Sequence, residues 1–248
     1  MAATAEIDAE LLALMEESER RQKRRQFFRL FPDHDVLARD GSVAIHARHK
    51  YDKHLEFFWA GKKYRERAAV CANRLGKTFG MGGYESVCHL TGLYPNWWPG
   101  HRFDRPVHGW AAGDWNETTR DIIQFTLCGR VTYEGTRRTV DGTGLIPGDR
   151  IGDVTWKQGV SNLIDTMAVK HASGGWSYLG LKSYQQGRAS FQGTARDFIW
   201  LDEEPPMEVY TECLTRTMTT GGLLYLTYTP LKGYSDVVRS FRPEDQLA

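Results

Sequence analysis

An eight-residue segment, residues 71–78, constrains the fold of this 248-residue chain more than any other stretch. It reads Cys-Ala-Asn-Arg-Leu-Gly-Lys-Thr and lies between an apolar run at 68–71 and a helix-compatible stretch at 78–90. A phosphate cradle needs this order: a strand, a loop whose backbone N–H groups turn inward, and a helix whose N-terminus faces the anion. The segment therefore predicts a variant of the G-x-x-x-x-G-K-S/T phosphate loop, in which Cys71 takes the position of the first glycine.

The side chains of this loop have predicted roles at the phosphates. Gly76 permits close approach of the backbone, Lys77 reaches the β- and γ-phosphates, and the Thr78 hydroxyl binds Mg²⁺. Arg74 is open to three interpretations: it stabilises charge on the γ-phosphate, it pairs with a neighbouring acid, or it is an exposed side chain beside the loop. The predicted nucleotide contacts of the loop are Asn73, Arg74, Leu75, Gly76, Lys77 and Thr78.

A second motif lies far downstream, where an apolar run at 198–201 ends in three consecutive carboxylates. Such a run is typical of a strand buried on both faces, and charge at its end is costly without a partner. We expect Asp202 to bind Mg²⁺, directly or through water, and Glu203 to orient and deprotonate the attacking water. Glu204 is the alternative base. The same carboxylates would also favour the N-terminus of a helix at 206–218, and both roles can hold together.

Short apolar runs alternate with helical stretches from residue 67 onward, which predicts an α/β fold with a mostly parallel central sheet flanked by helices. We expect helices at 6–28, 54–60, 78–90, 115–128 and 206–218. Strands are expected at 68–71, 107–112, 167–171, 177–181, 198–202 and 223–229. Residues 130–165 are rich in Gly, Thr and Asp, and we expect an insertion of loops and short strands there.

The overall charge is balanced, with 32 Lys and Arg against 31 Asp and Glu, so the chain is not uniformly coated for nucleic-acid binding. Lys62, Lys63 and the basic residues 20–25 are candidates for phosphate contacts, although 20–25 could also touch a neighbouring subunit or form a solvated helix tail. No apolar run reaches the roughly 18 residues of a membrane span. The four cysteines show no C-x-x-C pairing, which favours reduced thiols in a cytosolic protein.

Taken together, these motifs resemble the ATPase domain of the phage DNA-packaging terminase large subunit. The resemblance covers roughly 50–240 and rests on the segments 72–78, 93–98, 191–194, 200–206 and 227–233. It implies an additional-strand, catalytic-Glu P-loop NTPase fold that uses ATP and Mg²⁺. The implied domains are an N-terminal helical arm and linker at 1–49, a P-loop ATPase domain at 50–240, and the start of a linker at 241–248.

The resemblance also implies a motor that translocates double-stranded DNA into a procapsid. The implied partners are the DNA, further copies of the chain in a homo-oligomeric ring, a portal protein and a small terminase subunit, in the host cytoplasm and without a membrane. Large subunits of this family also carry a C-terminal nuclease domain. Few residues follow Lys232, so we expect nuclease activity to be absent from this chain.

Further residue roles follow from the resemblance. Thr227 and Thr229 would couple γ-phosphate loss to DNA-gripping elements, although the same segment could be an ordinary exit from a strand. His54 stands where the family carries a Gln that reads adenine. Arg188 is the predicted arginine finger that completes the site of the next subunit, and Arg196 is the alternative.

Two other functions are compatible with these motifs. A helicase-like translocase shares the phosphate loop and the Asp-Glu pair, but it would need a second motor domain, for which the chain shows no motifs. A nucleotide-dependent assembly scaffold would bind ATP and hydrolyse it little, because an arginine from a neighbouring subunit is worth about 10³- to 10⁵-fold in rate. Loss of hydrolysis in Glu203→Ala, with nucleotide binding kept, would distinguish the motor from the scaffold.

Overall fold

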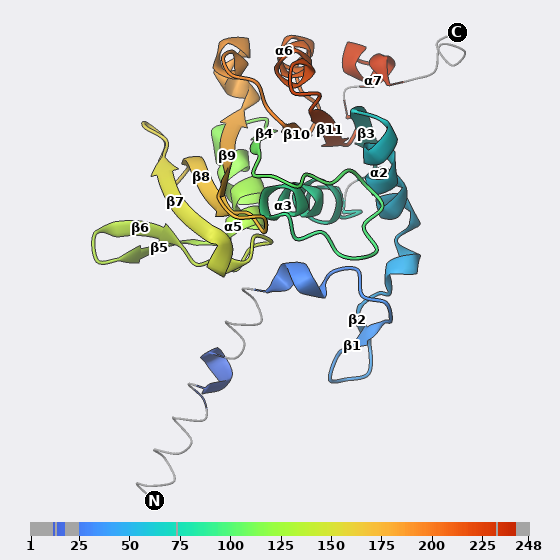
Figure 1. The fold of residues 1–248 in the computed structure, drawn as a ribbon, viewed down its shortest axis with the longest axis vertical. Coiled ribbons are helices and arrows are strands. Elements are labelled where there is room, and N and C mark those ends of the chain that lie inside the picture. Colours follow the sequence, from blue (N-terminus) through green and yellow to red (C-terminus); the bar gives the residue numbers. More distant parts are fainter. Residues whose placement is uncertain (1–11, 13, 18–24, 73, 232, 242–248) are drawn as a thin grey trace, which may run out of the picture.

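A seven-stranded sheet forms the centre of the fold in a computed structural model that describes residues 12, 14–17, 25–72, 74–231 and 233–241. Its strands run in the order β3 (Glu66–Val70), β11 (Leu223–Tyr228), β10 (Phe198–Asp202), β4 (His108–Gly113), β9 (Trp176–Ser183), β8 (Ile164–Lys170) and β7 (Ile151–Trp156). Neighbours from β3 to β9 are parallel, whereas β8 and β7 add on in antiparallel fashion. The predicted α/β fold with a mostly parallel sheet is confirmed (Figure 1).

The order of the first three strands brings the two sequence motifs to one edge of the sheet. Strand β3, which leads into the phosphate loop, pairs with β11, and β11 pairs in turn with β10, which carries the carboxylates. The strand inserted between them, β11, is the additional strand implied by the family resemblance. Because carboxyl ends of parallel strands lie together, the residues that follow β3, β10 and β11 converge.

Helices cover the two faces of the sheet (Figure 1). On one face lie α2 (Asp52–Lys63), the π-helical η3 (Lys77–Gly83) continued by α3 (Tyr84–Thr91), and the consecutive turns α4 (Asn116–Thr118), η4 (Thr119–Gln124) and α5 (Phe125–Cys128). On the other face lie α6 (Met207–Met218) and α7 (Asp236–Ser240). Shorter elements are η1 (Gln26–Arg29), η2 (Arg48–Lys50), η5 (Gly148–Arg150), η6 (Tyr184–Gln186), η7 (Arg188–Phe191), the hairpin β1 (Val36–Leu37) and β2 (Val43–Ile45), and the hairpin β5 (Val131–Glu134) and β6 (Arg137–Val140).

The central strands supply side chains to two hydrophobic cores, one on each face. In β10, Phe198 and Trp200 join the core beneath α3, whereas Ile199 and Leu201 join the core beneath α6. All four are fully buried, as the uninterrupted apolar run predicts. The alternation fixes which side chain of the following segment faces the phosphate loop.

Several elements differ from the sequence prediction. Within 130–165, short strands are present as predicted, but β7 joins the main sheet and β8 already begins at Ile164, so part of this region extends the sheet instead of forming an insertion. The predicted helix at 115–128 is present as three consecutive helical segments. Of the predicted helix at 6–28, residues 12 and 14–17 are helical and Gln26–Arg29 is a 3-10 turn, while the remainder lies almost entirely outside the described residues. The division into domains stays a prediction.

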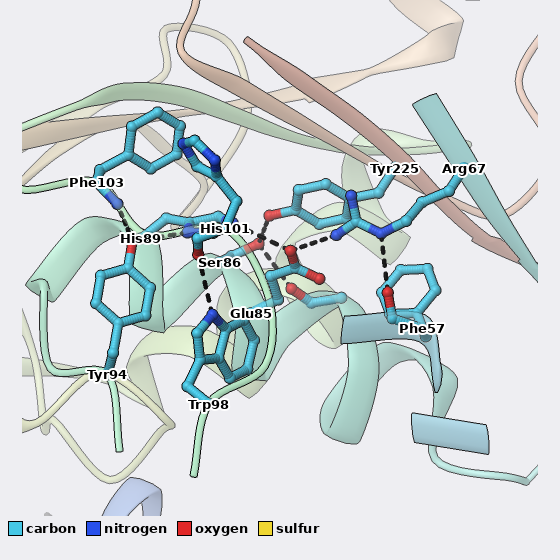
Figure 2. Close-up of polar contacts among 11 residues, drawn as sticks. Phe57, Arg67, Glu85, Ser86, His89, Tyr94, Trp98, His101, Phe103 and Tyr225 are labelled. Atoms are coloured by element: carbon cyan, nitrogen blue, oxygen red, sulfur yellow. Dashed lines mark hydrogen bonds and ion pairs between the residues drawn. The ribbon is translucent and has the colours of Figure 1, made fainter. Parts of the chain in front are cut away.

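A buried ionic network ties β3 to α3 (Figure 2). The Arg67 guanidinium forms an ion pair with Glu85 and donates from Nε to the Phe57 carbonyl oxygen at 3.1 Å. His89 Nε2 lies 3.1 Å from Glu85, and its Nδ1 lies 2.9 Å from the hydroxyl of Tyr94. Arg67 is 6% exposed and Glu85 is 0% exposed, so these charges depend on one another. The network fixes the strand before the phosphate loop against the helix after it.

Candidate nucleotide site

The phosphate loop leaves β3 and turns into η3 through two residues in the left-handed region. Arg74 has φ 65° and Gly76 has φ 76°. Glycine adopts this conformation freely, whereas arginine does so at a cost, so the loop holds Arg74 in a strained backbone conformation. Arg74 and Leu75 are exposed, and Asn73 lies outside the described residues.

Lys77, the first residue of η3, lies where β10 and β11 end. Its ammonium donates a hydrogen bond to Thr229 Oγ1 at 2.8 Å and lies 3.2 Å from Glu203 Oε1. The Lys77 side chain is only 8% exposed, whereas that of Glu203 is 39% exposed. One buried cation is therefore shared between the predicted base and one of the two predicted coupling residues.

Thr78, Asp202 and Thr227 form a second set of contacts behind the loop. Thr78 Oγ1 lies 3.0 and 3.1 Å from the two carboxylate oxygens of Asp202 and donates to them. Thr227 Oγ1 donates to Asp202 Oδ1 at 2.7 Å and accepts a hydrogen bond from the Trp200 indole, also at 2.7 Å. The predicted metal ligands, Thr78 and Asp202, are thus in direct contact, and both Thr227 and Thr229 face this site.

The electrostatics of Asp202 fit a cation site. Burial, and then the charge of Glu203, raises the pKa of Asp202 to about 7, against the hydrogen bonds from Thr227 and Thr78 and the charge of Lys77. A cation bound beside this carboxylate would favour its ionised form and lower its pKa. Mg²⁺ prefers carboxylate and hydroxyl oxygens and keeps positions for phosphate oxygens and water, so the donor set suits it. No group of three or more His, Cys, Asp and Glu side chains that could hold a metal is found among the described residues.

The backbone distinguishes Glu203 from Glu204. Glu203 has φ 65°, and its N–H donates to the Thr227 carbonyl oxygen at 3.0 Å. The Tyr184 hydroxyl lies 3.0 Å from the Asp202 carbonyl oxygen and 3.1 Å from that of Glu203, and so supports this unusual turn. Glu204 is 6% exposed, and its Oε2 has no hydrogen-bond partner within the described part of the chain. Glu203, and not Glu204, therefore lies beside Lys77.

His54 packs against the phosphate loop from α2. Its ring lies so close that a Cβ on Gly80 would fall 2.9 Å from His54 Nε2, and one on Gly76 would fall 3.5 Å away. Burial lowers the pKa of His54, which keeps the ring neutral near pH 7. A cavity of about 640 Å³ runs beside it, lined in part by Ala72 and Leu75. His54 thus lines this cavity together with residues of the phosphate loop.

The two candidate fingers lie on the α6 side of the sheet. Arg188 is 57% exposed, and its Nε lies 2.9 Å from Glu212 on α6. Arg196 lies with its guanidinium carbon 4.3 Å from the centre of the Trp110 ring. Both arginines thus have partners in their own chain, and neither shows a contact with the phosphate loop among the described residues.

Two residues of the site were not anticipated from the sequence. Trp200 crosses to η3, where a Cβ on Gly82 would fall 2.1 Å from its Nε1, so glycine is required there. Tyr184 supports the turn at Glu203 from a different strand connection. The glycine-rich stretch 80–83 is a visible signal for the first contact, because close packing needs small residues. No local pattern marks Tyr184.

Comparisons with known proteins identify the family to which this chain is similar. The family model described as terminase large subunit, T4likevirus-type, N-terminal, matches residues 69–247. The terminase large subunit of Salmonella phage P22 is 41% identical over an alignment of 210 residues, and the match covers 77% of this chain and 41% of that protein. The chain thus spans less than half the length of this relative.

Two solved structures of large terminases are similar to this chain at low sequence identity. The large terminase of the thermophilic bacteriophage D6E, in complex with ADP, has a similar fold with a TM-score of 0.50 and 14% identity, covering 76% of this chain and 42% of that one. The large terminase of bacteriophage HK97 gives a TM-score of 0.46 and 10% identity, covering 80% and 36%.

Proposed function

This chain belongs to the terminase large subunit family of the T4likevirus type, N-terminal part, and we propose that it is the ATPase motor of a phage DNA-packaging machine. In this proposal it hydrolyses ATP to translocate double-stranded DNA into a procapsid. The observation that carries the proposal is the convergence of Lys77, Glu203 and Thr229 beside the Thr78–Asp202–Thr227 contacts.

The proposed roles follow from these contacts. Backbone N–H groups of 73–77 and the Lys77 ammonium bind the phosphates of ATP. Thr78 and Asp202 hold Mg²⁺, which when bound neutralises charge on the phosphates. Glu203 orients the attacking water and takes its proton.

Lys77 connects nucleotide binding to the coupling segment. Its ammonium donates to Thr229 and pairs with Glu203, and phosphate oxygens would compete for the same ammonium. Arrival of the γ-phosphate would therefore free the Glu203 carboxylate for water and release Thr229 together. This gives the proposed coupling role of Thr229 a physical basis in one shared cation.

His54 and the neighbouring cavity are the proposed base subsite. The cavity lies beside Ala72 and Leu75 of the loop, and a neutral imidazole has both a donor and an acceptor nitrogen. We infer that His54 takes the place of the adenine-reading Gln.

The partners of the motor are proposed from the family. They are duplex DNA, a ring of identical subunits, a portal protein and a small terminase subunit, acting in the host cytoplasm. No helix in the described residues is long and apolar enough to cross a membrane.

A scaffold that binds ATP with little turnover is the second candidate. It is favoured by the pairing of Arg188 with Glu212, which leaves this finger candidate engaged within its own subunit. An isolated chain would then bind nucleotide well and hydrolyse it slowly.

Neighbouring isosteric variants test the assignment of the base. Glu203→Gln should keep binding of a fluorescent ATP analogue and lose hydrolysis by about 10²- to 10⁴-fold, because it removes the proton acceptor. Glu204→Gln is the matched control and should retain most of the hydrolysis. Loss confined to Glu204→Gln would overturn the assignment, and loss in neither variant would favour an activity from another protein.

A further inference from the structure

The sheet face that carries α6 is only partly covered. Helices α6 and α7 lie over the strands at the β3 side, where Ile199, Leu201 and Leu226 join their core. No described helix covers the same face of β7 and β8 (Figure 1). Trp176 is 45% exposed and Tyr178 is 41% exposed on this part of β9. Large exposed aromatic side chains on a regular sheet indicate a contact surface.

Strand register places aromatic and cationic side chains in rows across this open face. Lys170 on β8 pairs with Trp176 on β9, and Tyr178 on β9 pairs with His108 on β4. The rings of Tyr178 and His108 are stacked with centroids 5.3 Å apart. Directly paired residues point to the same side of a sheet, so these four side chains share one face.

Gly152 on β7 and Gly180 on β9 make room for two indole rings on this side of the sheet. A Cβ on Gly152 would fall 2.5 Å from the Trp176 ring, and a Cβ on Gly180 would fall 2.8 Å from the Trp110 ring. Trp176 is thus packed against β7 on the open face, whereas Trp110 is 4% exposed and belongs to the core beneath α6. Such a surface accepts a broad partner rather than a small molecule.

Cations gather at the end of this face toward η7. The Lys182 ammonium lies 4.7 Å from the centre of the Trp110 ring, which the guanidinium of Arg196 also contacts. Burial lowers the pKa of Lys182, and the charge of nearby Lys157 lowers it further. Asp165 is the nearby carboxylate that acts on both lysines. Together with Lys170, the face therefore concentrates positive charge on a chain whose net charge is only +1.

We propose that this face, defined by Lys157, Lys170, Trp176, Tyr178, Lys182 and Arg196, binds the phosphate backbone of duplex DNA. The inference rests on the proposed DNA-packaging function. Lys170 pairs with Trp176, and Lys182 lies six positions after Trp176 along β9. Six positions of an extended strand span about 20 Å. The cations are thus spread over several phosphates, since each strand of DNA presents one phosphate per about 3.4 Å of helix axis. Lys, Arg and Tyr contacts to phosphate and sugar carry no sequence information, as a general translocator requires.

The position of this face also connects it to the nucleotide site. Lys182 lies two residues before Tyr184, whose hydroxyl contacts the carbonyl oxygens of Asp202 and Glu203. A shift of the C-terminal end of β9 under load would therefore reach the turn that holds Glu203. Lys62 and Lys63, the candidates from the sequence, lie on α2 at the opposite edge of the sheet (Figure 1).

The test is binding of a short mixed-sequence duplex, followed by fluorescence anisotropy over a series of salt concentrations. Wild type is compared with Lys157→Gln/Lys170→Gln and with the matched control Lys62→Gln/Lys63→Gln, which removes the same charge from the far edge. The face variant should bind several-fold more weakly, and its slope of log affinity against log salt should fall by about 0.9 for each phosphate that it no longer neutralises. The control should keep the wild-type slope.

Other outcomes overturn the inference. Equal losses of affinity in both double variants would mean that net charge alone governs binding. No duplex binding by wild type, with self-association that the face variant abolishes, would make this surface an interface between copies of the chain. Binding of a fluorescent ATP analogue, measured on the same samples, separates these results from failure of the proposed function and shows that each variant is folded.

Trp176→Ala adds a readout without charge change, and it should weaken duplex binding with the salt slope unchanged.

Discussion

Thr227 is the side chain on which the polar contacts behind the phosphate loop depend. Its hydroxyl accepts from Trp200 and donates to Asp202, and Thr227 is fully buried. A single hydroxyl thus satisfies a buried donor and a buried acceptor at once. Removing it leaves both groups without that partner, which costs more than the net value of two ordinary hydrogen bonds.

We therefore expect Thr227→Val to lower the free energy of unfolding by about 1–3 kcal/mol and to weaken Mg²⁺-dependent ATP binding. Thr227→Ser is the matched control, because it keeps the hydroxyl and loses only a methyl group. Urea unfolding and nucleotide titration with and without Mg²⁺ measure the two effects. Equal behaviour of the two variants would show that the hydroxyl has no special role.

At the scale of elements, the buried network between β3 and α3 determines how rigidly the loop is held. Arg67 on β3 and Glu85 on α3 form an ion pair with almost no exposure. Burial opposes ionisation of Glu85, but the charges of Arg67 and His89 and their hydrogen bonds outweigh it, so the pKa of Glu85 lies below its usual value. Breaking one side of such a pair leaves a charge buried alone.

Arg67→Met should lower the free energy of unfolding by about 3–5 kcal/mol, since Glu85 then loses its partner. Adding Glu85→Gln to that variant should restore part of the stability, because the uncompensated carboxylate is removed. A double-mutant cycle by urea unfolding gives the coupling. Strictly additive effects would contradict an ion pair that depends on both members.

His89 makes the same network sensitive to acid. Burial lowers the pKa of His89, although Glu85 acts in the opposite sense. The unfolded chain has a histidine pKa of about 6.5, so it takes up a proton there that the folded state refuses. The free energy of unfolding should therefore fall as pH drops through about 6.5. His89→Gln should flatten this dependence, whereas His34→Gln, at an exposed position, should leave it unchanged.

The elements also show how far the sequence alone predicts this structure. The phosphate loop, β10 and α6 were predicted because their patterns are local: an apolar run, turn glycines and a helical period. The antiparallel direction of β8 and β7 was not predicted, because periodicity reports neither the neighbour of a strand nor the direction in which the two strands pair. The left-handed turn at Glu203 depends on Tyr184 from another connection, and only the tertiary fold places that residue.

At the scale of the whole molecule, the proposed nucleotide site and the proposed DNA surface involve different faces of one sheet. The phosphate loop and Thr78 belong to the α3 side, whereas Arg188 and the proposed DNA surface belong to the α6 side. Arg188 is paired with Glu212 on α6 in its own chain, and the proposed finger role has it reach the nucleotide of a neighbouring subunit in a ring.

Subunit mixing tests this arrangement. Lys77→Ala and Arg188→Ala should each hydrolyse ATP poorly, because one lacks the phosphate contact and the other lacks the finger. An equimolar mixture should recover part of the activity, since an intact Lys77 site can meet an intact Arg188 from a neighbour. In a parallel experiment, Lys77→Ala is mixed with Arg74→Ala. Recovery of activity in that mixture alone would identify Arg74, in the phosphate loop, as the finger.

The most direct test of the central claim is steady-state ATP hydrolysis with Mg²⁺ across a series of protein concentrations, for wild type and Lys77→Ala. The account predicts hydrolysis that requires Lys77 and rises more than linearly with protein concentration, because the site is completed between subunits. Hydrolysis that is the same in Lys77→Ala, or a wild type that neither binds nor hydrolyses ATP at any concentration, would contradict it.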